Sequence, residues 1–447
     1  MLTRVRLRTR RIVRELTRKL VSWLPRKYRF KVFRSFADCN PAPTSRLVLK
    51  IAETQEELEG SFSVLHDGYV DSGFMKPDPS GLRVTIYHAL PTTTTLCAKY
   101  DGEVVGTISL IRESALGFPL QRIFDLTSVR EKEGQIAEVS ALAIHRKFRK
   151  TGGTILFPLM KFMYEYCTTF FDTRHLVIAV NPSHIEMYES LLFFRRLTAN
   201  VVENYDFVNG APAIGATIDL KEAPEIFRKH YSSKPLRRNL YAYFMEVTLP
   251  NIQFPSRRFF TTNDPVLTPE LLDLFFNVRT RTFEKLSERK KALLYGIYDL
   301  PQYRAVLPVP FASAYDGHAT QNEPVRHHPR FSVKCPGQIT FVTAGGEHKR
   351  FSIRVIEVSS DGFQAIAHAV LPLNTACAAT IRLGHAEHSQ VSAFILREKR
   401  RDSRGLYGFR VDESDITWRK FVSALCGGTV YSDLDHATRF LESRFRE

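Results

Sequence analysis

Residues 139–166 read VSALAIHRKFRKTGGTILFPLMKFMYEY, and this stretch decides the fold of the first half of the chain. Val139–Ile144 is a short β-rich run, and Ile155–Tyr166 places apolar residues on one face of a helix. A second β-rich run, Leu176–Val180, follows the helix. Strand, glycine turn, helix and strand in this order predict a βαβ unit with both strands buried.

A strand and a hairpin are predicted before this unit. Leu47–Ile51 is short and apolar. Cys97–Tyr100 and Val104–Ile111 flank Asp101-Gly102, and an Asp-Gly pair between apolar runs is a hairpin signal. The first half is therefore expected to fold as a mixed α/β domain.

The turn at residues 146–154 has the composition of an anion-binding site. It reads RKFRKTGGT, so basic side chains surround a pair of glycines. Glycines let the backbone approach a ligand closely, and the free N–H groups at the start of a helix attract negative charge. The spacing fits neither a Walker loop nor a dinucleotide-binding fingerprint. The turn therefore predicts a phosphate site of another kind.

Arg149 and Gly152 carry a more specific signal. Their spacing resembles motif A of the GNAT acyltransferases, in which a strand runs into an [RQ]-x-x-G-x-[GA] loop, although Thr154 stands where the family has Gly or Ala. The resemblance implies that Arg149, Gly152 and Gly153 bind the pantetheine phosphate of coenzyme A or of acyl carrier protein. The alternative is a solvated basic loop.

A second segment with the same resemblance follows the second strand of the unit. Residues 181–188 read NPSHIEMY and are similar to the family's N-x-x-A-x-x-x-Y segment, with His184 in place of Ala. In that family the Tyr often protonates the leaving thiolate, so the resemblance implies that Tyr188 is the general acid. The alternative is a core tyrosine with a satisfied hydroxyl.

Within the GNAT superfamily the chain is most similar to the N-acyl amino acid synthases, which are relatives of the acyl-homoserine lactone synthases. The similarity rests on strings in a fixed order: DGEVVGTISL at 101–110, GFP at 117–119, IAEVSALAI at 136–144 and the segment 201–220. It implies transfer of a fatty acyl group to the amine of an amino acid. The resemblance also implies acyl carrier protein as donor and partner, and the basic turn would suit that acidic protein; acyl-CoA is the alternative. No motif names the amino acid.

Acyl transfer to an amine requires a group that accepts the proton of the amine, because only a neutral amine attacks a thioester. Glu138 lies near the start of the strand that leads into the turn, and we predict that it is this base. The alternative is a solvated glutamate at a strand end, since Glu side chains are mostly exposed. The reaction also needs oriented substrates and fixed donors for the oxyanion.

Residues 251–320 are predicted to be a helical connector with no chemistry of its own. Thr268 is a candidate N-cap, and Glu284–Leu294 has a charged helical pattern. Prolines at 301, 308 and 310 then mark a linker. The connector could also pack as part of the first domain.

From Phe331 onward the pattern changes to short alternating strands. Gly345-Gly346 and Asp361-Gly362 lie between such runs and are typical of hairpin turns. Several short strands at this spacing suggest a small antiparallel β-barrel, closed by a helix around Trp418–Leu425.

Two motifs lie at the entrance of this barrel. Arg326 and Arg330 fit R-x-x-x-R. Ser359 and Gly362 fit the second half of [DN]-x-S-x-x-G, with Glu357 in place of Asp or Asn. These motifs resemble the signatures of PilZ domains, and the resemblance implies that the five residues bind cyclic di-GMP. Arg suits this ligand, because its planar fork can pair with phosphate or with guanine O6 and N7. The alternative is a structural barrel with a solvated basic linker.

The formal net charge is +16, and much of it is concentrated at the N-terminus. Residues 1–35 hold thirteen Lys or Arg and one acid, and apolar residues from Val5 to Leu24 recur at helical spacing before Pro25. This pattern is typical of a helix on an anionic membrane surface. The alternatives are a solvated arm or a segment packed on the protein itself. A nucleic-acid binder would spread its charge over a folded face, so neither DNA nor RNA is expected.

Other features bear on the compartment. The six cysteines are scattered without a C-x-x-C pair, so no metal site or disulfide framework is expected and a cytoplasmic location fits. No apolar run approaches the length of about 18 residues that a transmembrane helix needs.

The expected fold class is α+β with several domains. A basic segment (1–45) precedes a GNAT-like domain (46–250), the connector (251–320), a PilZ-like barrel (321–425) and a tail (426–447). The leading hypothesis is an N-acyltransferase with no tightly bound cofactor, regulated by cyclic di-GMP. Its rival is a messenger-responsive adaptor whose GNAT-like half is inactive.

Overall fold

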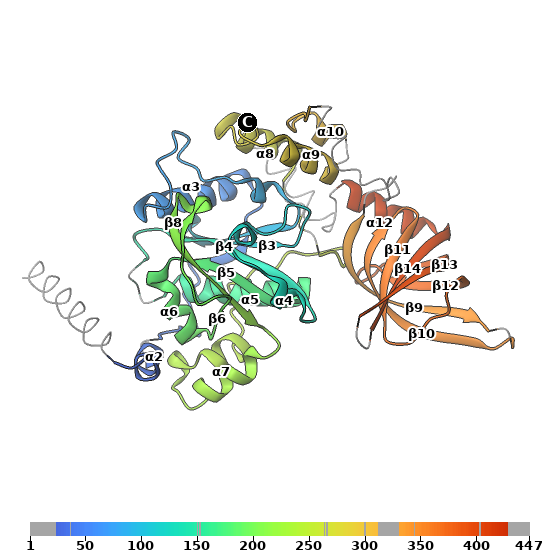
Figure 1. Ribbon diagram of the computed structural model, residues 1–447, viewed down its shortest axis with the longest axis horizontal. Coiled ribbons are helices and arrows are strands. Elements are labelled where there is room, and N and C mark those ends of the chain that lie inside the picture. Colours follow the sequence, from blue (N-terminus) through green and yellow to red (C-terminus); the bar gives the residue numbers. More distant parts are fainter. Residues whose placement is uncertain are drawn as a thin grey trace, which may run out of the picture.

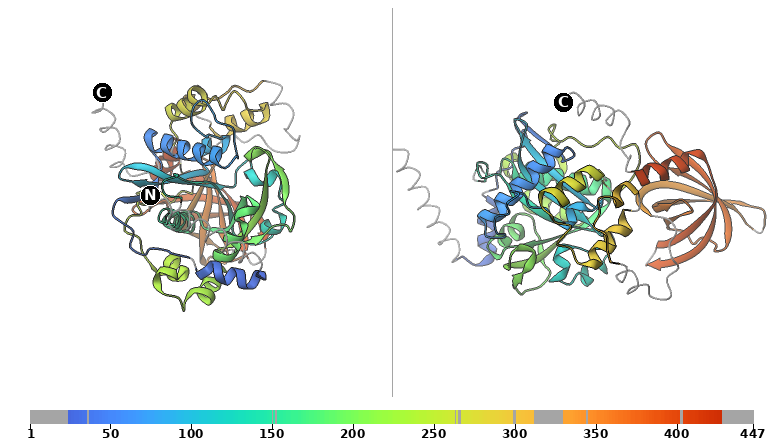
Figure 2. Two further views of the ribbon diagram at one scale, coloured as in Figure 1. Left: turned by 90° about the vertical axis from the view of Figure 1, so that its left-hand side faces the viewer. Right: turned by 90° about the horizontal axis from the view of Figure 1, so that it is seen from above.

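The computed structural model describes residues 24–35, 37–149, 151, 153–262, 264, 267–298, 301–311, 330–343, 345–401 and 404–427. They form a mixed α/β domain and a closed antiparallel barrel, which lies at one end of the first domain in two directions of view (Figures 1 and 2). The fold class predicted from the sequence is confirmed.

A mixed sheet forms the centre of the first domain. Its strands lie in the order β1-β2-β3-β4-β5-β8-β6, and β7 pairs with β8 beside this path. The predicted βαβ unit is confirmed, because β4 and β5 pair in parallel and α5 connects them. The strands are β1 (Leu47–Ile51), β2 (Thr93–Tyr100), β3 (Glu103–Arg112), β4 (Gln135–Ile144), β5 (Thr173–Val180), β6 (Arg195–Arg196), β7 (Val202–Tyr205) and β8 (Ala211–Asp219).

Helices cover both faces of this sheet. Leu96 and Ala98 of β2 share a core with α5, whereas Cys97 between them shares a core with α3, as the alternation of side chains along a strand requires. The helices of the domain are α2 (Arg26–Ser35), α3 (Gln55–Asp71), α4 (Thr127–Arg130), α5 (Leu156–Phe171), α6 (Pro182–Leu191) and α7 (Ala223–Tyr231).

β4 and β5 separate after a short paired stretch. Their register joins Gln135–Glu138 to Thr173–Val177 and goes no further. Farther along β4, Ala141 and Leu142 together face one residue of β3, which is a β-bulge, and Ala141 has a φ of 53°. The sheet is therefore open between the two strands on the side of the basic turn.

Most of the predicted connector packs on the first domain. Its helical elements are α8 (Pro269–Leu272), the π-helix η6 (Asp273–Arg279), α9 (Glu288–Ile297) and α10 (Pro301–Arg304), which lie beside α3 in Figure 1. Phe275 and Phe276 are buried in the same core as Phe62 of α3. Thr268 caps α8 as predicted, since its hydroxyl accepts from the N–H of Leu271 at 3.3 Å. The helix expected at 284–294 begins later, at Glu288.

The segment 251–264, here called the linking segment, lies between the two domains and contacts both. Its residue 263 lies outside the described part of the chain. Phe259 forms a bridge to Gly384 and Thr261 a bridge to Val333, so this segment extends the barrel. The ring of Phe259 is buried in the barrel core against Phe421, at 4.9 Å between centroids.

The barrel closes in the order β10-β11-β14-β13-β12-β9. Both predicted turns are confirmed, because residues 343–347 connect β9 to β10 and residues 360–361 connect β10 to β11. Trp418 and Phe421 on the last helix are fully buried in the barrel core. The elements are β9 (Phe331–Val342), β10 (His348–Ser359), β11 (Gly362–Ala367), β12 (Thr375–Arg382), β13 (His388–Arg401), β14 (Arg404–Ser414) and α12 (Ile416–Gly427).

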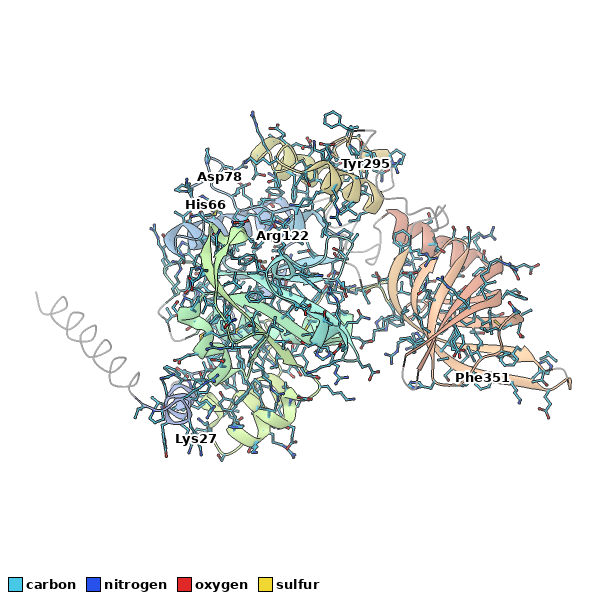
Figure 3. All side chains as sticks on the ribbon, viewed as in Figure 1. Lys27, His66, Asp78, Arg122, Tyr295 and Phe351 are labelled. Atoms are coloured by element: carbon cyan, nitrogen blue, oxygen red, sulfur yellow. The ribbon has the colours of Figure 1, made fainter. Side chains whose placement is uncertain are left out.

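The basic N-terminal helix α2 begins directly after Pro25 and packs on the protein itself. Arg26 pairs with Glu189 of α6 at 2.5 Å, and Arg29 pairs with Glu186 of the same helix. Lys27 on this helix and Phe351 on the barrel lie at opposite ends of the molecule (Figure 3). Residues 1–23, on which the membrane-surface prediction mainly rests, lie outside the described residues. None of the described helices combines the length and hydropathy needed to cross a bilayer.

Candidate active site and nucleotide-binding face

A cavity of about 420 Å³ opens where β4 and β5 separate. Most of its wall is apolar, and both the size and the lining are those of a ligand pocket. Apolar side chains of α5, α7 and the π-helix η5 (Ala242–Glu246) contribute to the wall, together with polar side chains of α3, α6 and β7. The apolar lining includes Met160, Met163, Leu176, Ile178, Leu220, Phe227 and Phe244, and the polar lining includes Tyr69, Ser140, Asn181, Tyr188 and Tyr205.

Glu138 lies in the paired part of β4, directly before the cavity-lining residues Val139 and Ser140. The expected alternative, a solvated glutamate, is wrong, because the side chain is 2% exposed. Its Oε2 accepts from the N–H of Leu120 at 3.0 Å. Burial raises the pKa of Glu138 to about 8, against the smaller lowering effect of that hydrogen bond. A carboxylate with such a pKa can accept a proton near neutral pH.

Tyr188 lies on α6 and lines the same cavity. Asn181 caps this helix by accepting from the N–H of Ser183 at 3.0 Å, which fixes where Tyr188 projects two turns later. The ring packs edge-on against Phe194 at 5.8 Å between centroids. Burial raises the pKa of the Tyr188 hydroxyl to about 12, so it carries a proton at neutral pH.

The basic turn lies beside the mouth of the cavity. The Nη1 of Arg149 pairs with Asp71 at 2.7 Å, and its Nε donates to the carbonyl of Ile144 at 2.7 Å. Asp71 is the last residue of α3, next to the cavity-lining Ser72. Gly153 has a φ of 90°, and a Cβ there would lie 2.4 Å from the ring of Phe157, so this position requires glycine. Gly152 lies outside the described residues.

On the barrel, Arg330 of the first predicted motif lies beside Glu357 of the second. The Nη1 of Arg330 donates to Glu357 Oε1 at 2.7 Å, and both side chains are about one third exposed. Ser359 Oγ donates to the carbonyl of Gly362 at 3.1 Å and closes the turn between β10 and β11. Arg326 lies outside the described residues.

Other residues on the outside of the barrel lie next to Arg330 and Glu357 and could not be found from the motifs. Strand pairing places Glu357, Gln364, Gly408 and Arg397 in one row across the outer surface of the barrel. With its oxygen turned toward the guanidinium groups, the amide of Gln364 accepts from Arg330 at 3.1 Å and from Arg397 at 3.0 Å. A Cβ on Gly408 would lie 2.9 Å from Arg397 Cγ, so glycine lets this Arg cross the strand.

A comparison with known families finds a match within the first domain. The family model described as "N-acyl amino acid synthase FeeM" matches residues 60–219. Over this region the chain resembles an N-acyl amino acid synthase. The matched region includes Glu138, Tyr188 and the basic turn. No curated protein sequence matches the chain.

Solved structures similar to the first domain include FeeM, an N-acyl amino acid synthase from uncultured soil microbes. That structure is 25% identical over 40% of this chain and 94% of its own, with a TM-score of 0.34. The CoA-dependent acyl-homoserine lactone synthase BjaI is 18% identical over 46% of this chain and 93% of its own, also with a TM-score of 0.34.

YcgR from Escherichia coli, solved with c-di-GMP, is 16% identical over 27% of this chain and 50% of its own, with a TM-score of 0.20.

The described residues of the acyltransferase domain and the barrel hold no group of three or more His, Cys, Asp or Glu side chains arranged to bind a metal ion. The five described cysteines are free and buried.

Proposed function

We propose that the acyltransferase domain moves a fatty acyl group from the thioester of acyl carrier protein, or of coenzyme A, to the amine of an amino acid. The observation that carries this proposal is an apolar cavity lined by Tyr188, with the buried Glu138 directly before the lining residues Val139 and Ser140. A carboxyl group with a raised pKa and a tyrosine with a raised pKa supply the base and the acid that the reaction needs.

In the proposed reaction the neutral amine attacks the thioester carbonyl carbon. A C–N bond forms, and Glu138 takes the proton that the amine loses. The oxyanion of the tetrahedral intermediate is stabilised by backbone N–H groups of the β4 bulge at Ala141 and Leu142. The C–S bond then breaks, and the Tyr188 hydroxyl gives its proton to the leaving thiolate. Tyr188 regains a proton from solvent and Glu138 releases one to solvent, so the net proton transfer is from amine to sulfur.

The cavity and the basic turn would each bind a different part of the acyl donor. The apolar end, with Met160, Met163 and Phe227, suits an acyl chain, because each buried methylene contributes about 0.8 kcal/mol. The basic turn lies outside the mouth and is the proposed site of the pantetheine phosphate, with Arg149, Gly152 and Gly153. For Arg149 to bind phosphate, it would exchange its pairing with Asp71.

Product analysis tests this proposal. Expression of the chain in a bacterium is expected to add an N-acylated amino acid to the lipid extract, detected by mass spectrometry. Tyr188→Phe should lower its yield by about 10²-fold or more, since general acid catalysis contributes at least that much. Tyr241→Phe, which changes a tyrosine outside the cavity lining, is the matched control and should leave the yield unchanged. An unchanged lipid extract would contradict the proposal and favour the adaptor hypothesis.

We propose further that the barrel binds cyclic di-GMP on the row formed by Glu357, Gln364 and Arg397, with Arg326 and Arg330 closing over the ligand. Two Arg side chains on this row offer planar donors to phosphate and to guanine. Glu357 neutralises Arg330 in the present arrangement. Binding would exchange that ion pair for contacts with the two phosphates.

Arg330→Ala is expected to weaken cyclic di-GMP binding by about 10- to 100-fold, because it removes a charged hydrogen-bond donor. Isothermal titration calorimetry on the full chain measures this change. Arg350→Ala, which changes an exposed arginine near the start of β10, should bind as the wild type does. Equal affinities for both variants would show that the motif does not hold the messenger.

Direct contacts between the domains support a regulatory role for the barrel. Lys334 and Arg354 of the barrel pair with Asp172, which ends α5, at 2.6 and 3.3 Å. The same helix lines the cavity with Met160 and Met163. A ligand that favours one position of the barrel would therefore act on a wall of the acyl site, provided that it binds the two positions with different affinities.

A further inference from the structure

Arg83 carries a partly buried guanidinium group. Among the described residues no carboxylate lies within salt-bridge distance of its guanidinium group. Its Nη2 donates to the carbonyl of Phe207 at 2.8 Å, and its Nη1 faces the sulfur of Met75 at 3.9 Å. The guanidinium carbon lies 4.2 Å from the ring centroid of Tyr69 and 5.3 Å from that of Phe207. A buried charge that lacks a counter-ion is costly, so this arrangement suits an anion that is supplied from outside.

The side chains around Arg83 lead into the cavity. Tyr69, on which the guanidinium lies, forms part of the cavity wall, and so does Tyr205. The ring of Tyr205 stacks on Phe207 at 5.7 Å, which places it beside the same aromatic group that Arg83 contacts. The Tyr205 hydroxyl is buried and has no hydrogen-bond partner among the described residues. Such a hydroxyl needs a partner, and a ligand acceptor atom would provide one.

The candidate base is an electrostatic neighbour of two tyrosines that line the cavity. The charge of Glu138 raises the pKa of Tyr205, after the larger effect of burial, and it also adds to the raised pKa of Tyr69. Both tyrosines are also electrostatic neighbours of Arg83 and oppose the lowering of its pKa by burial. Tyr69 and Tyr205 are therefore electrostatic neighbours of both the Glu138 carboxyl group and the Arg83 guanidinium group.

We propose that this cluster is the acceptor site, in which Arg83 and the Tyr205 hydroxyl bind the α-carboxylate of the amino acid and direct its amine toward Glu138. This inference rests on the proposed acyl transfer and names the chemical feature that selects its acceptor. An α-amino acid carries an anion and an amine on neighbouring carbon atoms, so one molecule can reach both buried groups. An amine without the carboxylate leaves the guanidinium group unpaired, and the site discriminates against it for that reason.

The test compares two acceptors that differ only in this anion. The purified full chain is assayed with each common protein amino acid, and the best acceptor is then compared with its own carboxamide, in which the carboxylate is replaced by a neutral group of similar size. The wild type is expected to prefer the amino acid by about 10- to 100-fold in kcat/KM. Arg83→Gln should remove this preference by raising KM for the amino acid, while kcat/KM for the amide changes little.

Two further variants are compared with Arg83→Gln. Tyr205→Phe keeps the ring and removes only the unpaired hydroxyl, so it should reduce the same preference by a smaller factor. Arg46→Gln changes an arginine that also lies over a tyrosine ring, at 4.7 Å, but that pairs with Asp101 on the surface, and it should behave as the wild type does. Circular dichroism establishes that all three variants are folded.

The outcomes separate this inference from the function on which it rests. If Arg83→Gln and the wild type discriminate equally between the amino acid and its amide, the carboxylate is bound elsewhere and the inference is wrong. If the wild type acylates no amino acid at all, the proposed function has failed instead. A wild type that acylates the amide as well as the amino acid would also overturn the inference.

Discussion

Glu138→Gln is expected to lower kcat/KM for the amine acceptor by about 10²- to 10⁴-fold, which is the usual contribution of a positioned general base. Gln has nearly the same shape and can still accept the hydrogen bond from the N–H of Leu120, but it cannot take a proton. The loss should therefore appear in the rate and not in the fold. Steady-state kinetics with a thiol-release readout measures it.

The pH profile provides an independent signature of the same residue. Only the ionised carboxylate is a base, and burial raises the pKa of Glu138 to about 8. The wild-type rate should rise as the pH increases through about 8, and this rise should be absent from the residual activity of Glu138→Gln. A matched control, Glu103→Gln, changes an exposed glutamate on β3 and should keep both the rate and the profile.

The stability of the folded wild type should fall with rising pH, whereas its rate should rise. The unfolded chain ionises this carboxyl group at about pH 4.5, whereas the folded chain holds the proton until about pH 8. The folded state binds more protons between these values, so the wild type loses stability as the pH rises through this window. Glu138→Gln removes that loss and is expected to be the more stable protein above pH 8. A variant that is both inactive and less stable at that pH would contradict the assignment.

Asp264→Ala is expected to destabilise the protein by about 3–5 kcal/mol, since it leaves buried cations without their counter-ion. Asp264 is 1% exposed and pairs with Arg257 of the linking segment. It also accepts hydrogen bonds from Thr94 of β2 and, at 3.0 Å, from the hydroxyl of Tyr166 on α5. Arg112 of β3 lies 4.0 Å away.

Thermal unfolding of the full chain measures this effect, and Asp101→Ala is the matched control. Asp101 pairs with Arg46 on the surface, where an ion pair contributes at most about 1 kcal/mol. The Asp264 variant should also respond less to cyclic di-GMP, because the same cluster holds the linking segment between α5 and the barrel. Equal unfolding midpoints for the two variants would mean that the cluster does not secure this junction.

Much of the fold could be predicted because local patterns agree with the tertiary structure. The alternation in β1, the Asp101-Gly102 turn and the strand–turn–helix order at 139–166 each specify their element without help from distant residues. The Thr268 cap and the hairpin turns of the barrel are equally local. Assigning the connector to the first domain was harder, because Phe275 and Phe276 meet α3 only in the folded chain.

The candidate sites were less predictable, because burial and cross-strand neighbours do not follow from spacing along the chain. Glu138 looks like an exposed strand-end residue in the sequence, and only the packing around β4 buries it. Arg83 belongs to no motif and meets Phe207 through the fold alone. The row from Glu357 to Arg397 crosses four strands, so strand pairing was needed to find it.

Direct acyl transfer within one cavity is tested most directly by counting both products of a single reaction. Purified full chain is incubated with hexadecanoyl acyl carrier protein and a ¹⁵N-labelled amino acid mixture, and free carrier thiol and labelled N-acyl amino acid are quantified together. Equal amounts of thiol and N-acyl product are predicted, with both nearly absent for Glu138→Gln. Thiol released without a labelled amide would mean that water, and not an amine, receives the acyl group.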